Sequence, residues 1–176
     1  VANWSGVTVD KSITQLEYLG RFYHIVDLPG MRSLTPGSPE QVIVRDFIIN
    51  QQPDLIVNVV DATNLERSLL LTLQLVELRV PMIIVLNMYD EVIKRGYVVD
   101  NKLLEGIFGV KVLTSNARQK SSLFDLKREI SEGASDRELS LPKELKYRPV
   151  VEAHVKLTEK ALNDCASHLG DKYSIR

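Results

Sequence analysis

Two short polar runs, Asp27-Leu28-Pro29-Gly30 and Asn87-Met88-Tyr89-Asp90, contain the residue types that could bind a nucleotide. Each run closes an apolar, β-rich stretch, so each is expected at a strand end, where open α/β sheets bind ligands. The carboxylate of Asp27 could hold magnesium, usually through water, because magnesium keeps much of its hydration shell. The N–H of Gly30 could meet a terminal phosphate oxygen, since glycine lets the backbone approach closely. The alternative for this first run is a strand followed by an ordinary turn.

The second run suits the recognition of guanine. The carboxylate of Asp90 could accept two N–H bonds from the N1 and N2 edge of the base, a pairing that adenine does not offer. A wrong base would leave a buried carboxylate unpaired, which costs several kcal/mol and gives strong discrimination. The alternative is a polar strand end at which Asp90 caps the next helix. The strand-like run Met82–Leu86 before it and the D-x-x-G run upstream favour guanine.

Two other segments could complete such a site, although each is a weak signal by itself. Ser115-Asn116-Ala117 follows the next strand-like run and could place backbone N–H groups on the guanine O6 atom, or form a plain strand-to-helix loop. Gly6-Val7-Thr8 precedes the first β-like runs. A threonine hydroxyl there could bind magnesium when the γ-phosphate is present, which would make the loop a switch.

Buried strands alternate with helices over most of the chain. The strands expected from apolar, β-rich runs are Ile13–Leu19 and Arg21–Leu28 as a hairpin, then Leu55–Val60, Met82–Leu86 and Val110–Leu113. The helices expected from start signals and apolar spacing run from Pro39 to about Gln52, from Thr63 or Asn64 onward, in a broken stretch after Asp90, and from Ser121 or Ser122 to about Ile130. This alternation predicts an α/β fold with a mostly parallel sheet and an antiparallel hairpin at one edge.

The composition is that of a globular protein. The chain has 176 residues, of which 44% are hydrophobic and 26% charged, enough for one domain of ordinary size with a small appendage. The formal net charge of −1 gives no overall attraction to nucleic acid. The single cysteine excludes an internal disulfide. No apolar run approaches the ~20 residues that span a bilayer. We expect a domain over residues 1–132, a polar linker over residues 133–146, and a helical segment over residues 147–176.

Several longer runs resemble one known family, the prokaryotic ferrous iron transporter FeoB, in its cytoplasmic GTPase domain. Ala2–Lys11 resembles the first switch of that domain, and Val26–Gly30 with Ser33-Leu34 resembles the second. The most specific match is Pro53–Arg67, and Leu71–Leu75 and Leu86–Asp90 continue it. The resemblance covers about residues 1–130, and residues 147–176 look like the start of the family's helical, GDI-like domain.

The resemblance implies a Ras-like P-loop NTPase fold and slow GTP hydrolysis coupled to iron(II) passage through a membrane domain. It places the chain on the cytoplasmic face of the prokaryotic inner membrane, with GTP or GDP, magnesium and potassium as ligands. It assigns Thr8 and Asp27 to magnesium but names no catalytic residue. The nucleotide contacts that it implies are Gly6, Val7, Thr8, Asp27, Leu28, Pro29, Gly30, Asn87, Met88, Asp90, Ser115, Asn116 and Ala117.

The sequence also departs from the family pattern. It contains no G-x-x-x-x-G-K-[ST] phosphate loop, so the first strand, that loop and the first helix of the fold have no counterpart, nor has the family's potassium-binding asparagine. We therefore expect this chain by itself not to hydrolyse GTP. Met31-Arg32 replaces a small residue and an aromatic one, and Asn116 replaces a frequent alanine.

Two alternatives to a GTPase domain of an iron transporter stay open. One is a GTPase-like regulatory or interaction fragment that binds no nucleotide and acts through its switch surface or helical tail; the lack of a phosphate loop favours it. The other is a different Ras-like GTPase, acting in ribosome assembly or tRNA modification. The near-neutral charge and the long match over Pro53–Arg67 argue against that alternative and against a nucleic-acid partner. A homo-oligomer is left open.

Overall fold

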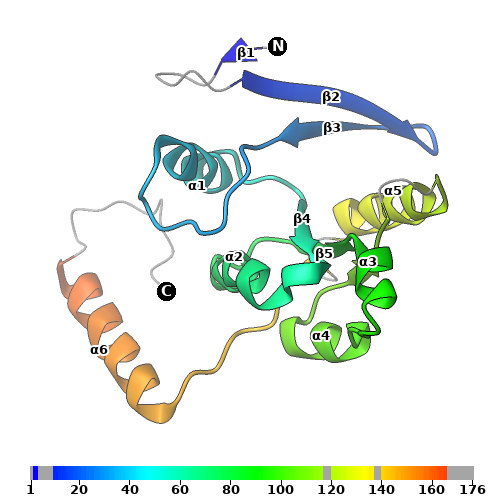
Figure 1. Ribbon diagram of the computed structural model, residues 1–176. Coiled ribbons are helices and arrows are strands. Elements are labelled where there is room, and N and C mark those ends of the chain that lie inside the picture. The colour runs from blue at the N-terminus through cyan, green and yellow to red at the C-terminus, as the bar shows by residue number, and fades with distance from the viewer. Residues whose placement is uncertain (1, 4–9, 117–119, 137–139, 166–176) are drawn as a thin grey trace. The chain divides into compact units, whose positions relative to one another are not determined.

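The computed structural model of the protein describes residues 2–3, 10–116, 120–136 and 140–165. The chain divides into two units, Val1–Lys143 and Glu144–Arg176. The first unit contains an antiparallel sheet, a parallel sheet and the helices that connect their strands (Figure 1). The second contains helix α6 (Pro149–Cys165). The predicted α/β fold class, with a parallel sheet and an antiparallel hairpin, is confirmed.

The antiparallel sheet consists of β1 (Ala2–Asn3), β2 (Asp10–Tyr18) and β3 (Arg21–Asp27), in that order. Strands β2 and β3 form the expected hairpin, in register from Ser12 opposite Asp27 to Tyr18 opposite Arg21. Leu19 and Gly20 connect them, both with positive φ (51° and 74°). Two left-handed residues are the geometry of a tight hairpin turn whose twist matches that of its strands, so the turn sets the register that ends β3 at Asp27.

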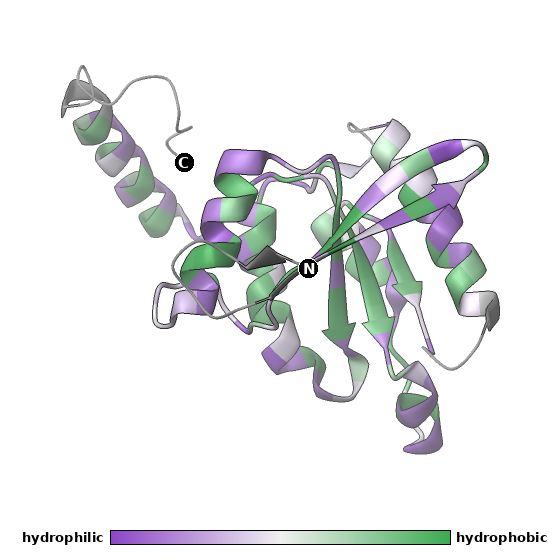
Figure 2. Ribbon diagram, turned by 90° about the horizontal axis from the view of Figure 1, so that it is seen from above, coloured by the Kyte–Doolittle hydropathy of each residue, from purple (hydrophilic) through white to green (hydrophobic). Residues whose placement is uncertain are grey.

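The parallel sheet consists of β4 (Ile56–Asp61), β5 (Met82–Asn87) and β6 (Val112–Thr114), with β5 in the middle. Met82–Leu86 are all buried, as expected of a strand that is covered on both faces. Helix α2 packs against β4, α5 against β5 and α4 against β6. Figure 2 shows the apolar residues gathered on these strands and on the helix faces near them. The core therefore lies around β5, the strand that ends at Asn87.

The helices of the first unit connect and flank these strands. They are α1 (Pro39–Gln51), the 3-10 turn η1 (Ala62–Asn64), α2 (Leu65–Glu77), α3 (Tyr89–Lys94), α4 (Asn101–Phe108) and α5 (Lys120–Ser135). Asp100 caps the N-terminus of α4, where its carboxylate accepts the Leu103 N–H (3.0 Å), and Gly109, with φ 74°, caps the C-terminus. Among the described residues, no helix has the length and apolar character needed to cross a membrane.

Residues 133–146, the expected linker, include a segment that packs into the first unit. Helix α5 continues to Ser135, and a side chain at Gly133 would come within 3.2 Å of Leu55 and 2.9 Å of Ser140. The glycine thus allows this close packing of α5. Pro142 is buried, and the N–H of Lys143 donates to the carbonyl of Phe108 (2.7 Å). The linker and the domain limits 1–132 and 147–176 remain predictions.

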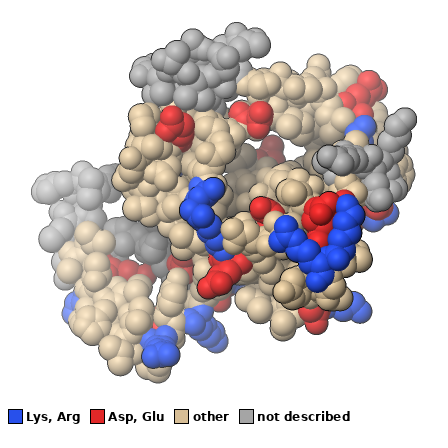
Figure 3. Space-filling model, viewed as in Figure 1, with Lys and Arg blue, Asp and Glu red and all other residues tan. Residues whose placement is uncertain are grey.

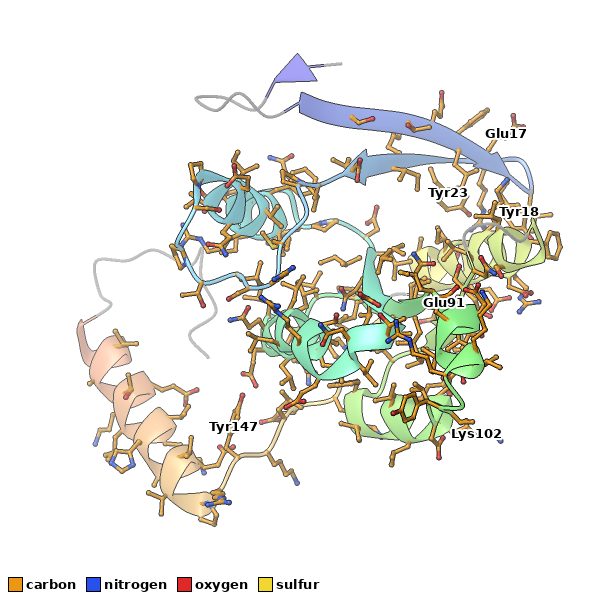
Figure 4. All side chains as sticks on the ribbon, viewed as in Figure 1. Glu17, Tyr18, Tyr23, Glu91, Lys102 and Tyr147 are labelled. Carbon is orange, nitrogen blue, oxygen red and sulfur yellow. The ribbon has the colours of Figure 1, made fainter. Side chains whose placement is uncertain are left out.

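The hairpin tip rests on α5. The rings of Tyr18 and Phe124 meet edge to face with centroids 6.4 Å apart. The hydroxyl of Tyr23 lies 2.8 Å from Ser131 Oγ, and Arg21 donates to Ser135 Oγ (2.6 Å). Figure 4 shows Tyr18 and Tyr23 projecting from the hairpin toward this helix. Contacts from both strands thus hold the hairpin, and with it the end of β3, against the rest of the unit.

A buried polar pair joins β4 to α2. The side-chain amide of Asn58 donates to Thr72 Oγ1 (2.7 Å), and both residues are buried. Thr72→Val removes the acceptor while keeping the shape, so the Asn58 amide is left buried and unpaired. We expect the free energy of unfolding to fall by about 1–3 kcal/mol, measured by urea denaturation.

The double variant Asn58→Leu/Thr72→Val is the control, because it removes both polar groups and is expected to recover part of that loss. A Thr72→Val protein within about 0.5 kcal/mol of wild type, the range of ordinary surface changes, would contradict the prediction.

Candidate nucleotide site

Three polar strand ends meet at one edge of the parallel sheet. In the register of β4 and β5, Asp61 lies opposite Asn87, and in that of β5 and β6, Leu86 lies opposite Thr114. The carboxyl ends of all three strands therefore face the same side, which is where open α/β sheets bind ligands. Asn87 is half-buried at the end of the buried strand β5, so the core positions it.

The Asn87–Asp90 run turns from strand into helix within two residues. Met88 has left-handed backbone geometry (φ 59°) and is the N-cap residue of α3, without a capping hydrogen bond from its side chain. Asp90 lies in the first turn of α3. It is therefore not the capping residue that the alternative interpretation of this run required.

The third predicted segment is hydrogen-bonded directly to this loop. The N–H of Ser115 donates to the carbonyl of Leu86 (2.8 Å), and the carbonyl of Ser115 accepts the N–H of Tyr89 (3.3 Å). The N–H of Asn116 donates to Ser122 Oγ (3.4 Å), which ties the segment to α5. Two loops that are far apart in sequence are thus joined beside Asn87 and Asp90.

The carboxylate of Asp90 faces a cation from its own helix. Lys94 Nζ lies 3.4 Å from Asp90 Oδ2 and 2.6 Å from Glu91 Oε1. These contacts, first the hydrogen bond to Glu91, raise the pKa of Lys94 above its ordinary value. The bond to Glu91 is the shorter one, and the side chain of Asp90 is 34% exposed, so the pair leaves Asp90 accessible. Figure 3 shows acidic and basic side chains gathered together on one part of an otherwise mostly uncharged face.

The Asp27–Gly30 loop is more exposed and less hydrogen-bonded than the Asn87–Asp90 loop. Asp27 is exposed at the end of β3, and no hydrogen bond from another described residue reaches its carboxylate. Leu28 and Pro29 are half-buried. A side chain at Gly30 would meet nothing within 4 Å, so packing inside the described part of the chain does not require glycine there.

An exposed carboxylate without a competing partner suits magnesium, which is bound through oxygen and takes few ligands from the protein. Asp27 thus fits the predicted metal role by its chemistry. Thr8, the other predicted ligand, lies outside the described residues, as do Gly6, Val7 and Ala117. Within the described residues, no group of three or more His, Cys, Asp or Glu side chains could hold a metal ion.

The structure therefore brings together only some of the predicted site. Asn87, Met88 and Asp90 lie beside Ser115 and Asn116, but no hydrogen bond or ion pair among the described residues links them to the Asp27–Gly30 loop. Asp61, which lies opposite Asn87, is a polar strand-end residue that was not predicted from the sequence to belong to the site. The sequence feature that could have indicated Asp61 is its position at the end of the apolar run Leu55–Val60. Its carboxylate accepts both the N–H (2.9 Å) and the hydroxyl (2.7 Å) of Thr63, so it serves to cap η1.

A parallel sheet ending in an N-x-x-D loop, beside a hairpin ending in D-x-x-G, defines the class of Ras-like GTPase domains. The sequence model of the family "Ferrous iron transport protein B" matches residues 1–130. The chain belongs to this family, in the part that forms its N-terminal GTPase domain.

Relatives and solved structures agree with this assignment. A curated "Fe(2+) transport protein A/Fe(2+) transporter FeoB fusion protein" of Porphyromonas gingivalis is 39% identical over 168 residues, 93% of this chain and 20% of the relative. The "Fe(2+) transporter FeoB" of Campylobacter jejuni is 41% identical over 123 residues, 70% of this chain and 20% of the relative. The chain thus spans a fifth of the length of these two relatives.

Among solved structures, the cytosolic domain of the T. maritima FeoB iron transporter in a GDP form has a TM-score of 0.86 at 33% identity and covers 93% of this chain and 64% of its own. The FeoB G-domain from Methanococcus jannaschii has a TM-score of 0.69 at 46% identity and covers 73% of this chain and 81% of its own. Both likenesses confirm the Ras-like fold.

Proposed function

We propose that this chain is part of a GTP-binding and GTP-hydrolysing domain that regulates ferrous iron uptake by a membrane transporter, at the cytoplasmic face of a prokaryotic inner membrane. The observation that carries the proposal is the pair of joined loops at the sheet edge, in which Ser115 is hydrogen-bonded on both sides of the Asn87 loop. The T. maritima structures described as GDP and GMPPNP forms support a nucleotide as the ligand.

The two ends of the site have different tasks. On the base side, Asp90 accepts the N1 and N2 hydrogens of guanine, and backbone N–H groups of residues 115–117 donate to its O6 atom. On the phosphate side, Gly30 donates its N–H to the γ-phosphate, and Asp27 and Thr8 hold magnesium. Magnesium, when bound, neutralises the developing charge on the phosphates. Potassium is a further proposed ligand.

The proposal also gives roles to the helical unit and to a membrane domain of the full-length transporter. Helix α6 exposes Val150, Val151 and Leu157, as expected of a first helix whose partners lie in a larger helical domain. In the family's pattern that domain retains the nucleotide, and the GTPase domain acts on a membrane domain that conducts iron(II). The length of the curated relatives, of which this chain spans a fifth, supports such a partner.

One observation favours a second function, that of an interaction fragment without nucleotide. The 176 residues contain no G-x-x-x-x-G-K-[ST] motif, and this loop supplies the lysine and most backbone donors for the β-phosphate. Because the base and magnesium ends alone leave the phosphates without these donors, we expect residues 1–176 to bind GDP too weakly to be useful.

A titration with a fluorescent GDP analogue, with and without magnesium, tests the proposal. Residues 1–176 are compared with the natural protein in its full length. We expect binding at micromolar concentrations or tighter by the natural protein and none by residues 1–176 below high micromolar concentrations. A natural protein that binds no guanine nucleotide would contradict the proposal and favour the interaction fragment. Tight binding by residues 1–176 would show that the phosphate loop is not required.

A further inference from the structure

The loop that follows Gly30 is held by a glutamine from a distant helix. The N–H of Leu34 donates to Gln74 Oε1 on α2 (2.6 Å), and Gln74 Nε2 donates to Thr35 Oγ1 (3.3 Å). The side chain of Leu34 is buried at the same point. Gln74 is itself half-buried, and both atoms of its side-chain amide are bonded to the loop.

Among the described residues, this contact is the first hydrogen bond after Asp27 that joins the loop to another element. Residues 28–33 make no backbone–backbone hydrogen bond within the described part of the chain. At Leu34 the loop is fixed by Gln74, and at Gly37 and Ser38 it is fixed again, because Gln41 Oε1 accepts both of their N–H groups (2.8 and 2.9 Å). As far as the structure describes the chain, the hydrogen bonds to another element that lie nearest to Gly30 on either side are therefore those of β3 and the Gln74 contact at Leu34.

Helix α2 connects this anchor to the base side of the site. It follows η1 directly, and η1 packs against α3, the helix that contains Asp90. Gln74 lies ten residues beyond Asn64, which is about 15 Å along a helix. Rigid secondary elements are one route by which two sites can be coupled, and α2 is the continuous element between η1 and Gln74.

We infer that Gln74 is a positioning residue for the Asp27–Gly30 loop, tying the phosphate side of the site to the base side through α2. The inference rests on the proposed function for its consequence in GTP hydrolysis, but not for the contact itself. Without Gln74, the described part of the loop has no hydrogen bond to another element between Asp27 and the bonds of Gln41 to Gly37 and Ser38. The conformation in which the Gly30 N–H can donate to a γ-phosphate oxygen is then less populated.

Amide hydrogen exchange on residues 1–176 tests the contact. In the wild type, the Leu34 N–H is expected to be protected while those of Arg32 and Ser33 exchange freely. Gln74→Met, which keeps the length and apolar stem, is expected to speed exchange at Leu34 by about tenfold, the loss of one hydrogen bond. Gln74→Glu keeps the acceptor and should hold Leu34 near the wild-type rate.

Gln41→Met is the matched control, since it removes a glutamine that binds the other end of the loop. It should speed exchange at Gly37 and Ser38 and leave Leu34 protected. An unprotected Leu34 in the wild type, or unchanged protection in Gln74→Met, would overturn the inference. The exchange rate of the Leu34 N–H in the wild type tests the contact even if the Gln74→Met variant fails to fold.

The consequence is measured in the natural protein. Gln74→Met should lower kcat for GTP hydrolysis several-fold while leaving GDP affinity within twofold, because GDP lacks the γ-phosphate, and Gln74→Glu should restore kcat. Equal losses of both quantities, or an unchanged kcat, would overturn the positioning role. A natural protein that binds no nucleotide would overturn that role together with the proposed function, while the exchange data would still decide whether Gln74 holds Leu34.

Discussion

Replacement of Asp90 by alanine is expected to weaken binding of GDP to the natural protein by roughly 100-fold. The carboxylate is placed to accept two N–H bonds from guanine, and a hydrogen bond to a charged group contributes about 1.5–3 kcal/mol. The titration with a fluorescent GDP analogue measures the loss directly. An adenine nucleotide should bind poorly to the wild type and equally poorly to the variant, because adenine presents no such pair of donors.

Glu91→Ala is the matched control for this change. Asp90 and Glu91 are neighbours on α3, and both pair with Lys94, so either substitution removes one negative charge from the same cation. Only Asp90 is proposed to touch the base, and we expect the affinity of Glu91→Ala to stay within a fewfold of wild type. Equal losses in the two variants would mean that the charge of α3, rather than a contact with guanine, governs binding.

Leu86→Ala is expected to lower the free energy of unfolding by about 2–5 kcal/mol. Leu86 has no exposed surface, and it lies in the middle strand of the parallel sheet, packed on both faces. Truncation there removes apolar contacts and leaves a cavity that a sheet centre cannot close. Urea denaturation followed by circular dichroism gives the loss. Because Leu86 directly precedes Asn87 and accepts the Ser115 N–H through its carbonyl, the joined loops should loosen too.

Val59→Ala serves as the comparison, since it truncates a β-branched side chain on the adjacent strand β4 that is 61% exposed. Its effect should stay within about 1 kcal/mol, the span of β propensity. A Val59→Ala protein destabilised as much as Leu86→Ala would show that β5 is not the centre of the core.

The strands and helices of the first unit were largely predictable because each depends on local chemistry. The run Met82–Leu86 has too many consecutive apolar residues for a half-exposed strand, and the observed β5 differs from it by one residue. Pro39 opens α1 as predicted, since proline fits the first helical position. The loop at Asn87–Asp90 was predictable in the same way, from its residue types and the strand before it.

The roles of other residues could not be predicted from the neighbouring sequence. Gly133 was one of the residues that suggested a linker over residues 133–146, yet it lies inside α5, where a Cβ atom would come within 2.9 Å of Ser140 Oγ and 3.2 Å of the Leu55 side chain. Asp61 and Asp27 are both carboxylates at strand ends. The first is engaged by Thr63, while the second has no hydrogen bond from the described residues, a difference that depends on the conformation of the following two residues.

The fold class and the two runs at strand ends were predictable from the sequence, because apolar periodicity and residue type are properties of short segments. The family was indicated by the resemblance of longer runs such as Pro53–Arg67. Which of these segments meet depends on the tertiary structure. It joined Ser115 to the Asn87 loop through strand register, and it brought Gln74 to Leu34 across forty positions of the chain. Such contacts depend on how helices and strands pack against one another, and no spacing within a segment encodes them.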